Sequence, residues 1–333
     1  MKKYLLFLLP LILLFASCSQ PKLSEVKLNG MAQGTYYAIT YYDAAGRNFQ
    51  PQIDSFFVEF DKSASVYLPE SIISRFNNND STIMADEAFT AVFNKASEVS
   101  EITGGAFDIT TMPLTNAWGF GFTDPGKLDR NTVDSLLPLV GYKNIALADG
   151  KLIKSNPAIT IDFNAIAQGY SADLIGKMLQ KEGIENYLID VGGEVLARGG
   201  KPDGSSWRVG IEKPSSDPTA RDIDAVVLLK NKALASSGNY RRFFMKDGIR
   251  YSHTIDPKTG YPVTHSLLSV SVLAEDCMTA DAYATAFMVM GLEKSKEFLS
   301  LHPELDAHFI FSNERGENEV WSTEGLRRIT ETR

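Results

Sequence analysis

Strand-like segments and segments with a hydrophobic residue every three or four positions follow one another irregularly along this chain of 333 residues. This order restricts the fold more than any other feature. Thr35 to Tyr42 is dense in β-branched and aromatic residues, which is typical of a strand, and a bend over Gly30 to Gly34 precedes it. Apolar residues recur every three or four positions from Phe89 onward, which predicts an amphipathic helix over Glu87 to Ile102. Because strands and helices alternate without a strict βαβ rhythm, the expected fold class is α+β.

Further elements are expected in the second half of the chain. Strands at Ala158 to Phe163 and Tyr187 to Val191 flank an expected helix from Ala167 to Lys181. Two neighbouring strands, Trp207 to Ile211 and Ala225 to Leu229, are joined by a proline-containing surface loop from Lys213 to Asp222. Met278 to Met290 is rich in Ala and Met and predicts another helix. A chain of this length buries a large core, as one domain of two closely joined lobes.

The N-terminus has the layout of a secretory signal peptide. Two lysines precede an apolar run from Tyr4 to Phe15, and Ala16-Ser17 stand immediately before Cys18. This predicts a bacterial lipoprotein: residues 1–17 are the signal peptide, Cys18 is lipidated, and residues 18–25 form a tether to the membrane. The alternative is an uncleaved anchor, but Pro10 interrupts the run, and a spanning helix needs about 20 apolar residues. We expect a lipid-anchored protein of the cell envelope, facing the periplasm or the exterior.

Charge and cysteine content restrict the partners. The formal charge is −8, with 33 basic and 41 acidic residues, and loss of the two N-terminal lysines makes the mature chain still more acidic. This excludes nucleic acid as a partner, since its binding needs basic patches that displace counterions. If Cys18 is lipidated, Cys277 has no partner for an intrachain disulfide, and it is expected to be a buried packing residue.

Five short motifs carry groups that suit a phosphate and a hard cation. They are Gly105-Ala-Phe-Asp108, Asp162-Phe-Asn-Ala-Ile-Ala-Gln-Gly169, the small-residue turn Ser236-Ser-Gly-Asn-Tyr240, the stretch from His253 to Pro262, and Asp281-Ala-Tyr-Ala-Thr285. Residues four apart lie on one helix face, so the oxygens of Asp281 and Thr285 can meet one ion. Mg²⁺ prefers such oxygen ligands and keeps places for substrate phosphates. Taken alone, the same pair is equally a surface carboxylate beside a threonine bonded to its own helix.

In this order the five motifs resemble the ApbE family, the FAD:protein FMN transferases, over nearly all of the chain after residue 26. The resemblance implies that residues 26–333 form one catalytic domain. It also implies Mg²⁺-dependent transfer of FMN from FAD to a threonine or serine hydroxyl of a target redox protein, with release of AMP. The implied partners are therefore FAD, an acceptor redox protein with a threonine-containing motif, and the membrane reached through Cys18.

The resemblance also assigns the site. The ion is implied to be held by Asp281, Thr285 and the backbone carbonyl of Ala165. The flavin nucleotide is implied to contact the residues that match the family pattern, namely Met31, Tyr67, Ala106, Phe107, Asp108, Asp162, Gln168, Ile255 and Ala284. Gln168 stands where many relatives have lysine, so a charge contact with the pyrophosphate is not expected here. Asp162 also suits the N-cap of the following helix.

His253 precedes Asp256-Pro-Lys-Thr-Gly260, which suits a type I turn. Its place in the family motif favours a general base over a structural histidine, alongside Asp281 as the second catalytic residue. Two other functions share the same contacts: a lipoprotein that binds FAD without turnover, and an FAD pyrophosphatase that uses water in place of the acceptor hydroxyl. The sequence alone leaves these two alternatives open.

Overall fold

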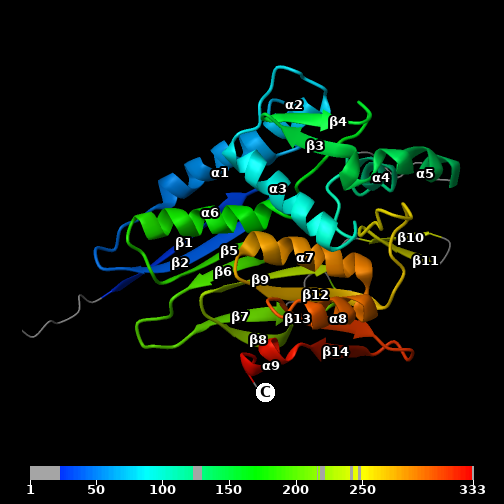
Figure 1. Ribbon diagram of the computed structural model, residues 1–333. Coiled ribbons are helices and arrows are strands. Elements are labelled where there is room, and N and C mark those ends of the chain that lie inside the picture. Colours follow the sequence, from blue (N-terminus) through cyan, green and yellow to red (C-terminus); the bar gives the residue numbers. More distant parts are fainter. Residues whose placement is uncertain are drawn as a thin grey trace, which may run out of the picture.

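An eight-stranded antiparallel sheet forms the centre of the structure, in the order β1-β2-β5-β6-β9-β12-β13-β14 (Figure 1). Its strands are β1 (Ser24–Ala32), β2 (Thr35–Asp43), β5 (Tyr187–Val191), β6 (Glu194–Arg198), β9 (Lys232–Gly238), β12 (Leu267–Ala274), β13 (Asp306–Ser312) and β14 (Asn318–Ser322). Two-stranded sheets join β3 (Ile145–Ala148) to β4 (Lys151–Lys154), β7 (Trp207–Glu212) to β8 (Ile223–Leu229), and β10 (Phe243–Lys246) to β11 (Ile249–Ser252). This computed structural model describes residues 23–122, 130–215, 217, 222–240, 243–246 and 249–331.

One face of the large sheet carries the principal helices (Figure 1). Helices α1 (Gln50–Ala64), α6 (Ala167–Lys181) and α7 (Cys277–Met290) pack on the strands, and α3 (Glu87–Ile102) packs against α1 and α7. Alternate side chains of β5 point into this layer, so Tyr187, Ile189 and Val191 are buried in one core with Ile175 and Leu179 of α6. Shorter helices are α2 (Ile72–Asn77), α4 (Met112–Ala117), α5 (Arg130–Leu136), α8 (Leu292–Leu301) and α9 (Glu324–Arg328), with 3₁₀ turns at Leu137–Leu139 and Tyr142–Asn144.

The opposite face of the sheet is covered by β7, β8 and α9. A second core lies there, in which Val195 and Leu234 of the large sheet join Trp207, Val227 and Leu326. The side chains that alternate with these point to the helical face. The central strands β6, β9, β12 and β13 therefore supply side chains to two different cores.

A third, smaller core holds the loop around His253 against α4 and α5. Ile255 of this loop is buried with Leu114, Trp118 and Val133. The indole N–H of Trp118 donates to the carbonyl of Gly260 over 2.8 Å. The loop is therefore anchored by a packed cluster and by a hydrogen bond across 142 residues of sequence.

The α+β class is confirmed, and most expected elements lie where their patterns placed them. Helices α3 and α6 and strand β5 have the predicted bounds, β7 pairs with β8, and Cys277 is fully buried. β1 begins at Ser24, inside the range assigned to the tether. Residues 1–22, with the signal peptide and Cys18, lie outside the described part of the chain. No helix among the described residues is long and apolar enough to span a membrane.

Three local predictions were wrong. The segment Ala158 to Phe163 is irregular and not a strand, because its backbone does not pair with a neighbouring strand. The N–H of Ile161, for example, donates to the side chain of Asn77. Ser236 to Gly238 end β9 and are not a turn, since they pair with β12. The bend expected over Gly30 to Gly34 is only the turn Gln33-Gly34, whose residues both have positive φ, and Met31 lies within β1.

Candidate active site

Three of the five motifs and the turn between β1 and β2 converge where α6 begins beside the middle of α7. The backbone N–H of Gly169 donates to Oδ2 of Asp281 over 3.1 Å, which joins the two helices. Ser171, also in the first turns of α6, donates its hydroxyl to Oε1 of Gln33 in the β1–β2 turn at 3.2 Å. Thr285, one turn after Asp281, has its Oγ1 3.3 Å from Oγ of Ser237 in β9. The structure therefore brings Asp281 and Thr285 together with the segment that contains Ala165 and Gln168.

Asp281 is held in a buried position. Helix α7 is started by Asp276, whose Oδ1 accepts from the N–H of Thr279 at 2.8 Å, so the i, i+4 face of Asp281 and Thr285 is fixed. The side chain is 6% exposed, and this burial raises the pKa of Asp281 to about 7. The Gly169 N–H opposes that rise, while the carboxylate of Asp173 adds to it. A buried carboxylate with one neutral donor is the kind of group that a cation stabilises.

A second buried acid, Glu194, lies at the start of β6 and was not predicted from the sequence. It is 7% exposed, and among the described residues its Oε2 has no hydrogen-bond partner. Burial raises the pKa of Glu194 well above its usual value, and the charges of Asp281 and Asp190 raise it further. The only sequence signal was the adjacent Gly192-Gly193 pair, whose positive φ angles make the β5–β6 turn.

The oxygen groups here fit a divalent cation. Asp281 and Thr285 provide a carboxylate and a hydroxyl, and Ala165 lies half-buried four residues before Gly169. Within the described part of the chain, no three His, Cys, Asp or Glu side chains cluster closely enough to hold a metal. An ion here would therefore depend on hydroxyl, carbonyl and substrate oxygens besides carboxylate, which is the ligand set that Mg²⁺ accepts.

The residues expected to contact the flavin divide into exposed and buried groups. Met31 is 77% exposed, and Tyr67 is 69% exposed with its ring centre 5.0 Å from that of Phe122. These three side chains offer uncovered apolar surface to a flat ring. In contrast, the side chains of Ala106, Phe107, Ile255 and Ala284 are buried in the cores, so contact through their side chains is restricted.

Asp108 and Asp162 stabilise the loops that surround the site. Asp108 accepts from the N–H and hydroxyl of Thr110 and from the N–H of Tyr142, and burial nevertheless raises its pKa. The N–H of Asp162 donates to the carbonyl of Ile109 at 3.0 Å, which joins the two motif loops.

Asp162 does not cap α6, because the N-cap is Ile166; instead its Oδ1 accepts from the N–H of Asn164. Burial raises the pKa of Asp162 to about 6. Gln168 is half-buried in the first turn of α6, and its carbonyl accepts from the Ser171 hydroxyl at 2.8 Å.

His253 is half-buried, and its ring meets that of Phe120 edge-on with 6.3 Å between ring centres. The turn after it is wider than the expected type I turn: Gly260, with positive φ, donates its N–H to the carbonyl of Asp256 four residues earlier. Val263 N–H returns to the carbonyl of Thr254 at 3.0 Å. These two hydrogen bonds fix the chain on both sides of the turn that follows His253.

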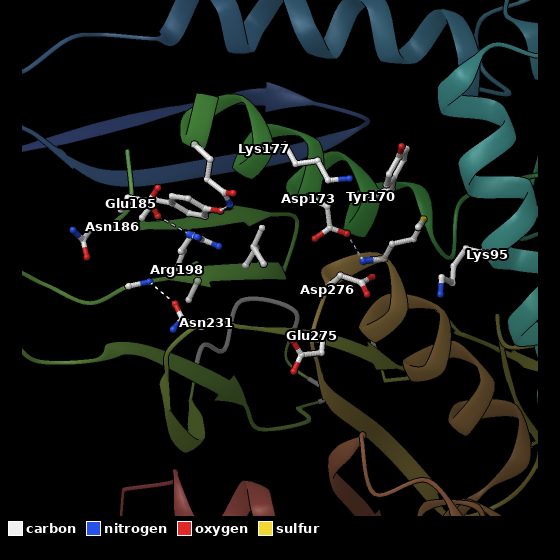
Figure 2. A pocket seen from close by; sticks show the side chains of 16 residues that line it. Lys95, Tyr170, Asp173, Lys177, Glu185, Asn186, Arg198, Asn231, Glu275 and Asp276 are labelled. Atoms are coloured by element: carbon white, nitrogen blue, oxygen red, sulfur yellow. Dashed lines mark hydrogen bonds and ion pairs between the residues drawn. The ribbon is translucent and has the colours of Figure 1, made fainter. Parts of the chain in front are cut away.

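A separate cavity of about 900 Å³ lies at the other side of the α6–α7 contact (Figure 2). Asp173 points into it and accepts from the N–H groups of Cys277 and Met278, and Arg198 pairs with Glu185 across it. None of the motif residues assigned above lines this cavity. Its side chains bear charges of both signs, so it offers no defined charge to a ligand.

The architecture and the buried carboxylates of Asp281 and Glu194 define an α+β protein with an acidic candidate site on the helical face of one large sheet. The model of the ApbE family matches residues 33–309, and the chain belongs to that family. An FAD:protein FMN transferase from Vibrio cholerae is 37% identical over 305 residues, with 88% of this chain and 89% of that protein covered. One from Haemophilus influenzae is 33% identical and covers 96% of this chain and 95% of its own length.

Solved structures agree with this assignment. The flavin transferase ApbE from Vibrio cholerae superimposes with a TM-score of 0.83 at 32% identity, covering 92% of this chain and all of that one. The apo form of the flavinyl transferase ApbE from Pseudomonas stutzeri gives a TM-score of 0.83 at 31% identity, with 92% and 97% covered. The similarity extends over both faces of the sheet and is not confined to the motifs.

Proposed function

We propose that this protein is an FAD:protein FMN transferase that uses Mg²⁺. The observation that carries the proposal is the buried carboxylate of Asp281, joined to the start of α6 by the Gly169 N–H, in a chain of this family. The curated relatives bear that activity in their names at 32–37% identity over most of their length.

The reaction joins the hydroxyl oxygen of a threonine or serine on the acceptor to the phosphorus of the FMN half of FAD. The bond from that phosphorus to the bridging oxygen breaks, and AMP leaves with the electron pair. The hydroxyl proton passes to a base, for which His253 is the proposed group. A bound Mg²⁺ would neutralise charge on the pyrophosphate and the leaving group.

The residues of this chain have distinct roles in that reaction. Asp281, Thr285 and the carbonyl of Ala165 would hold the ion, and the exposed side chains of Met31 and Tyr67 would meet the flavin ring. Gln168 would offer the pyrophosphate a neutral amide at the position where many relatives have a charged lysine. Orientation of the phosphorus by these groups accounts for most of the expected acceleration, since phosphoryl transfer needs little covalent participation by the protein.

The test is incubation with FAD, Mg²⁺ and a candidate acceptor protein, followed by in-gel flavin fluorescence on the acceptor and by AMP release. Asp281→Asn should abolish both signals, as should chelation, whereas Asp134→Asn, exposed on α5, should change neither. Flavin binding without AMP would indicate a carrier. AMP release without labelling of any acceptor would indicate a pyrophosphatase.

We also propose that the protein is lipid-anchored through Cys18 in the cell envelope, with a membrane-bound or exported redox protein as acceptor. The proposal is supported by the apolar run before Cys18 and by the acidic net charge, which leaves acyl chains as the means of membrane contact. Cys18→Ala should leave the membrane fraction, or accumulate as precursor, without loss of transfer activity. Absence of label from a fatty-acid analogue on the wild-type protein would contradict it.

A further inference from the structure

Glu194 opens β6 and lies on the helical face of the large sheet, where α7 contacts β6. Leu196, two residues on and on the same face, meets the backbone of α6 at Gly176. The Oε2 of Glu194 lies close to the tip of the β5–β6 turn: a Cβ added to Gly192 would be 3.4 Å from that oxygen and 3.2 Å from Oγ1 of Thr35. Glu194 therefore lies next to Thr35, which follows the β1–β2 turn, and to the Gly192-Gly193 turn.

The charges that act on Glu194 have the same sign as its own. Asp281 and Asp190 both disfavour its ionised form. The donors that serve those two acids are neutral: Gly169 N–H for Asp281, and Gly193 N–H with the Tyr36 hydroxyl for Asp190. Leaving a buried acceptor such as Glu194 Oε2 unpaired costs about 1–3 kcal/mol. Without a positive charge nearby, the ionised form of Glu194 is therefore unfavourable in the fold.

We propose that Glu194 is a second carboxylate of the cation site, whose charge is balanced by the divalent ion that Asp281 binds. The proposal rests on the proposed function for the presence of that ion. A divalent cation supplies the positive charge that Glu194 and Asp281 lack among their described neighbours, and hard cations prefer carboxylate oxygen. Glu194 acts here as a positioning residue: it fixes the ion, and hence the substrate phosphates, against the sheet.

The test measures Mg²⁺ affinity without turnover, from the rise in melting temperature of the detergent-solubilised full chain as MgCl₂ is added in the absence of FAD. Glu194→Gln keeps size and hydrogen bonding but removes the charge, and it should weaken Mg²⁺ binding about tenfold or more. The metal-free variant should melt at or above the wild-type temperature, because the buried amide, unlike the carboxyl group, does not have to be kept protonated in the fold. Glu194→Asp keeps the carboxylate, but the shorter side chain moves it away from the ion. The Mg²⁺ affinity of this variant should therefore lie between those of wild type and the glutamine variant.

Glu297→Gln, exposed on α8, is the matched control and should change neither quantity. Wild-type Mg²⁺ affinity in a folded Glu194→Gln or Glu194→Asp variant would overturn the inference. So would weakened FAD binding at unchanged Mg²⁺ affinity, which would assign Glu194 to the flavin. If Mg²⁺ raises the melting temperature of wild type no more than that of Asp281→Asn, then Asp281 does not bind Mg²⁺, and the cation site of the proposed function itself is refuted.

Discussion

The backbone N–H of Gly169 in α6 donates to Oδ2 of Asp281 in α7, and the contact exists only because residue 169 has no side chain. A Cβ at this position would lie 2.4 Å from the carbonyl oxygen of Cys277 and 2.9 Å from Cβ of Asp281. The nearest of these atoms belongs to the backbone of α7, so it cannot rotate away. The close approach of the two helices, and with it the position of the buried carboxylate, depends on this glycine.

Gly169→Ala is therefore expected to separate α6 from α7. We expect a loss of about 1–3 kcal/mol in the free energy of unfolding, as for other overpacked sites, together with weaker Mg²⁺ binding. Gly176→Ala on the same helix is the control, because the nearest atoms to its Cβ would be the side-chain ends of Leu196 and Tyr187, which belong to strands and not to α7. It should alter stability without changing Mg²⁺ affinity. Urea unfolding and Mg²⁺ titration of both variants decide this, and a Gly169→Ala protein with wild-type values in both would refute it.

The stability of the metal-free protein should fall as pH rises. The pKa of Asp281 is about 7 in the fold, against about 3.9 in an unfolded chain, so between these values the unfolded chain ionises while the folded protein keeps the proton. Raising the pH through this window therefore favours unfolding. Asp173, whose pKa burial raises to about 7, acts in the same direction.

Asp281→Asn removes one of these two groups. Its stability relative to wild type should increase between pH 5 and pH 8 by on the order of 1 kcal/mol or more, since a tenfold change in proton affinity is worth about 1.4 kcal/mol. Urea unfolding with a chelator present measures this difference. Saturating Mg²⁺ should reverse it by stabilising the ionised wild-type carboxylate. A difference that does not change with pH would mean that Asp281 ionises freely in the fold.

The sequence predicted the regular elements well where periodicity and chain breakers agreed. Helix α3 combines apolar residues at three- and four-residue steps with Gly104 beyond its end, and its bounds were predicted correctly. Ala158 to Phe163 misled the same reasoning, because Ile159, Ile161 and Phe163 are buried at alternate positions as in a strand. Burial on one side of an extended segment gives that pattern whether or not a neighbouring strand exists. Only the hydrogen bonds, which go to Asn77 and Ile109, distinguish the two cases.

The arrangement of the candidate site was predicted in part. The spacing of Asp281 and Thr285 placed both on one helix face, and the structure adds that this face meets α6 and β9. Glu194 was missed because its proposed role depends on a strand packed against a helix that follows about 80 residues later, which no local pattern encodes. Asp162 was interpreted as a cap for α6, but α6 begins five residues further on.

His308 is expected to stabilise the junction between the two sheets without affecting the site. It is buried on the face of β13 opposite α7, with Nδ1 2.8 Å from Ser322 Oγ in β14 and Nε2 3.1 Å from Asp224 Oδ2 in β8. His308→Ala should cost about 2–3 kcal/mol, because two hydrogen bonds are lost in a buried setting. A double-mutant cycle with Ser322→Ala should give a coupling energy above 0.5 kcal/mol. Transfer activity per folded molecule should be unchanged, and loss of activity at full folding would place His308 in the active site.

His253→Ala tests whether this protein transfers FMN or only binds FAD. Its side chain is half-buried beside Phe120, on a loop fixed by Trp118, so removal of the imidazole should leave the loop in place. FAD affinity should stay within a few-fold of wild type, since a base that only takes the acceptor's proton contributes little to holding the flavin. FMN transfer should fall by about 100-fold or more, the usual scale of a lost general base.

The two quantities are measured by quenching of flavin fluorescence on binding and by in-gel flavin signal on the acceptor. His302→Ala is the control, because that half-buried histidine stacks on Phe298 of α8 and pairs with Glu304, and it should leave transfer unchanged. Unchanged transfer in His253→Ala would make His253 a structural residue of its loop. Loss of FAD binding would instead make it a wall of the flavin pocket, because an imidazole packed against the ring would contribute to affinity and to transfer together.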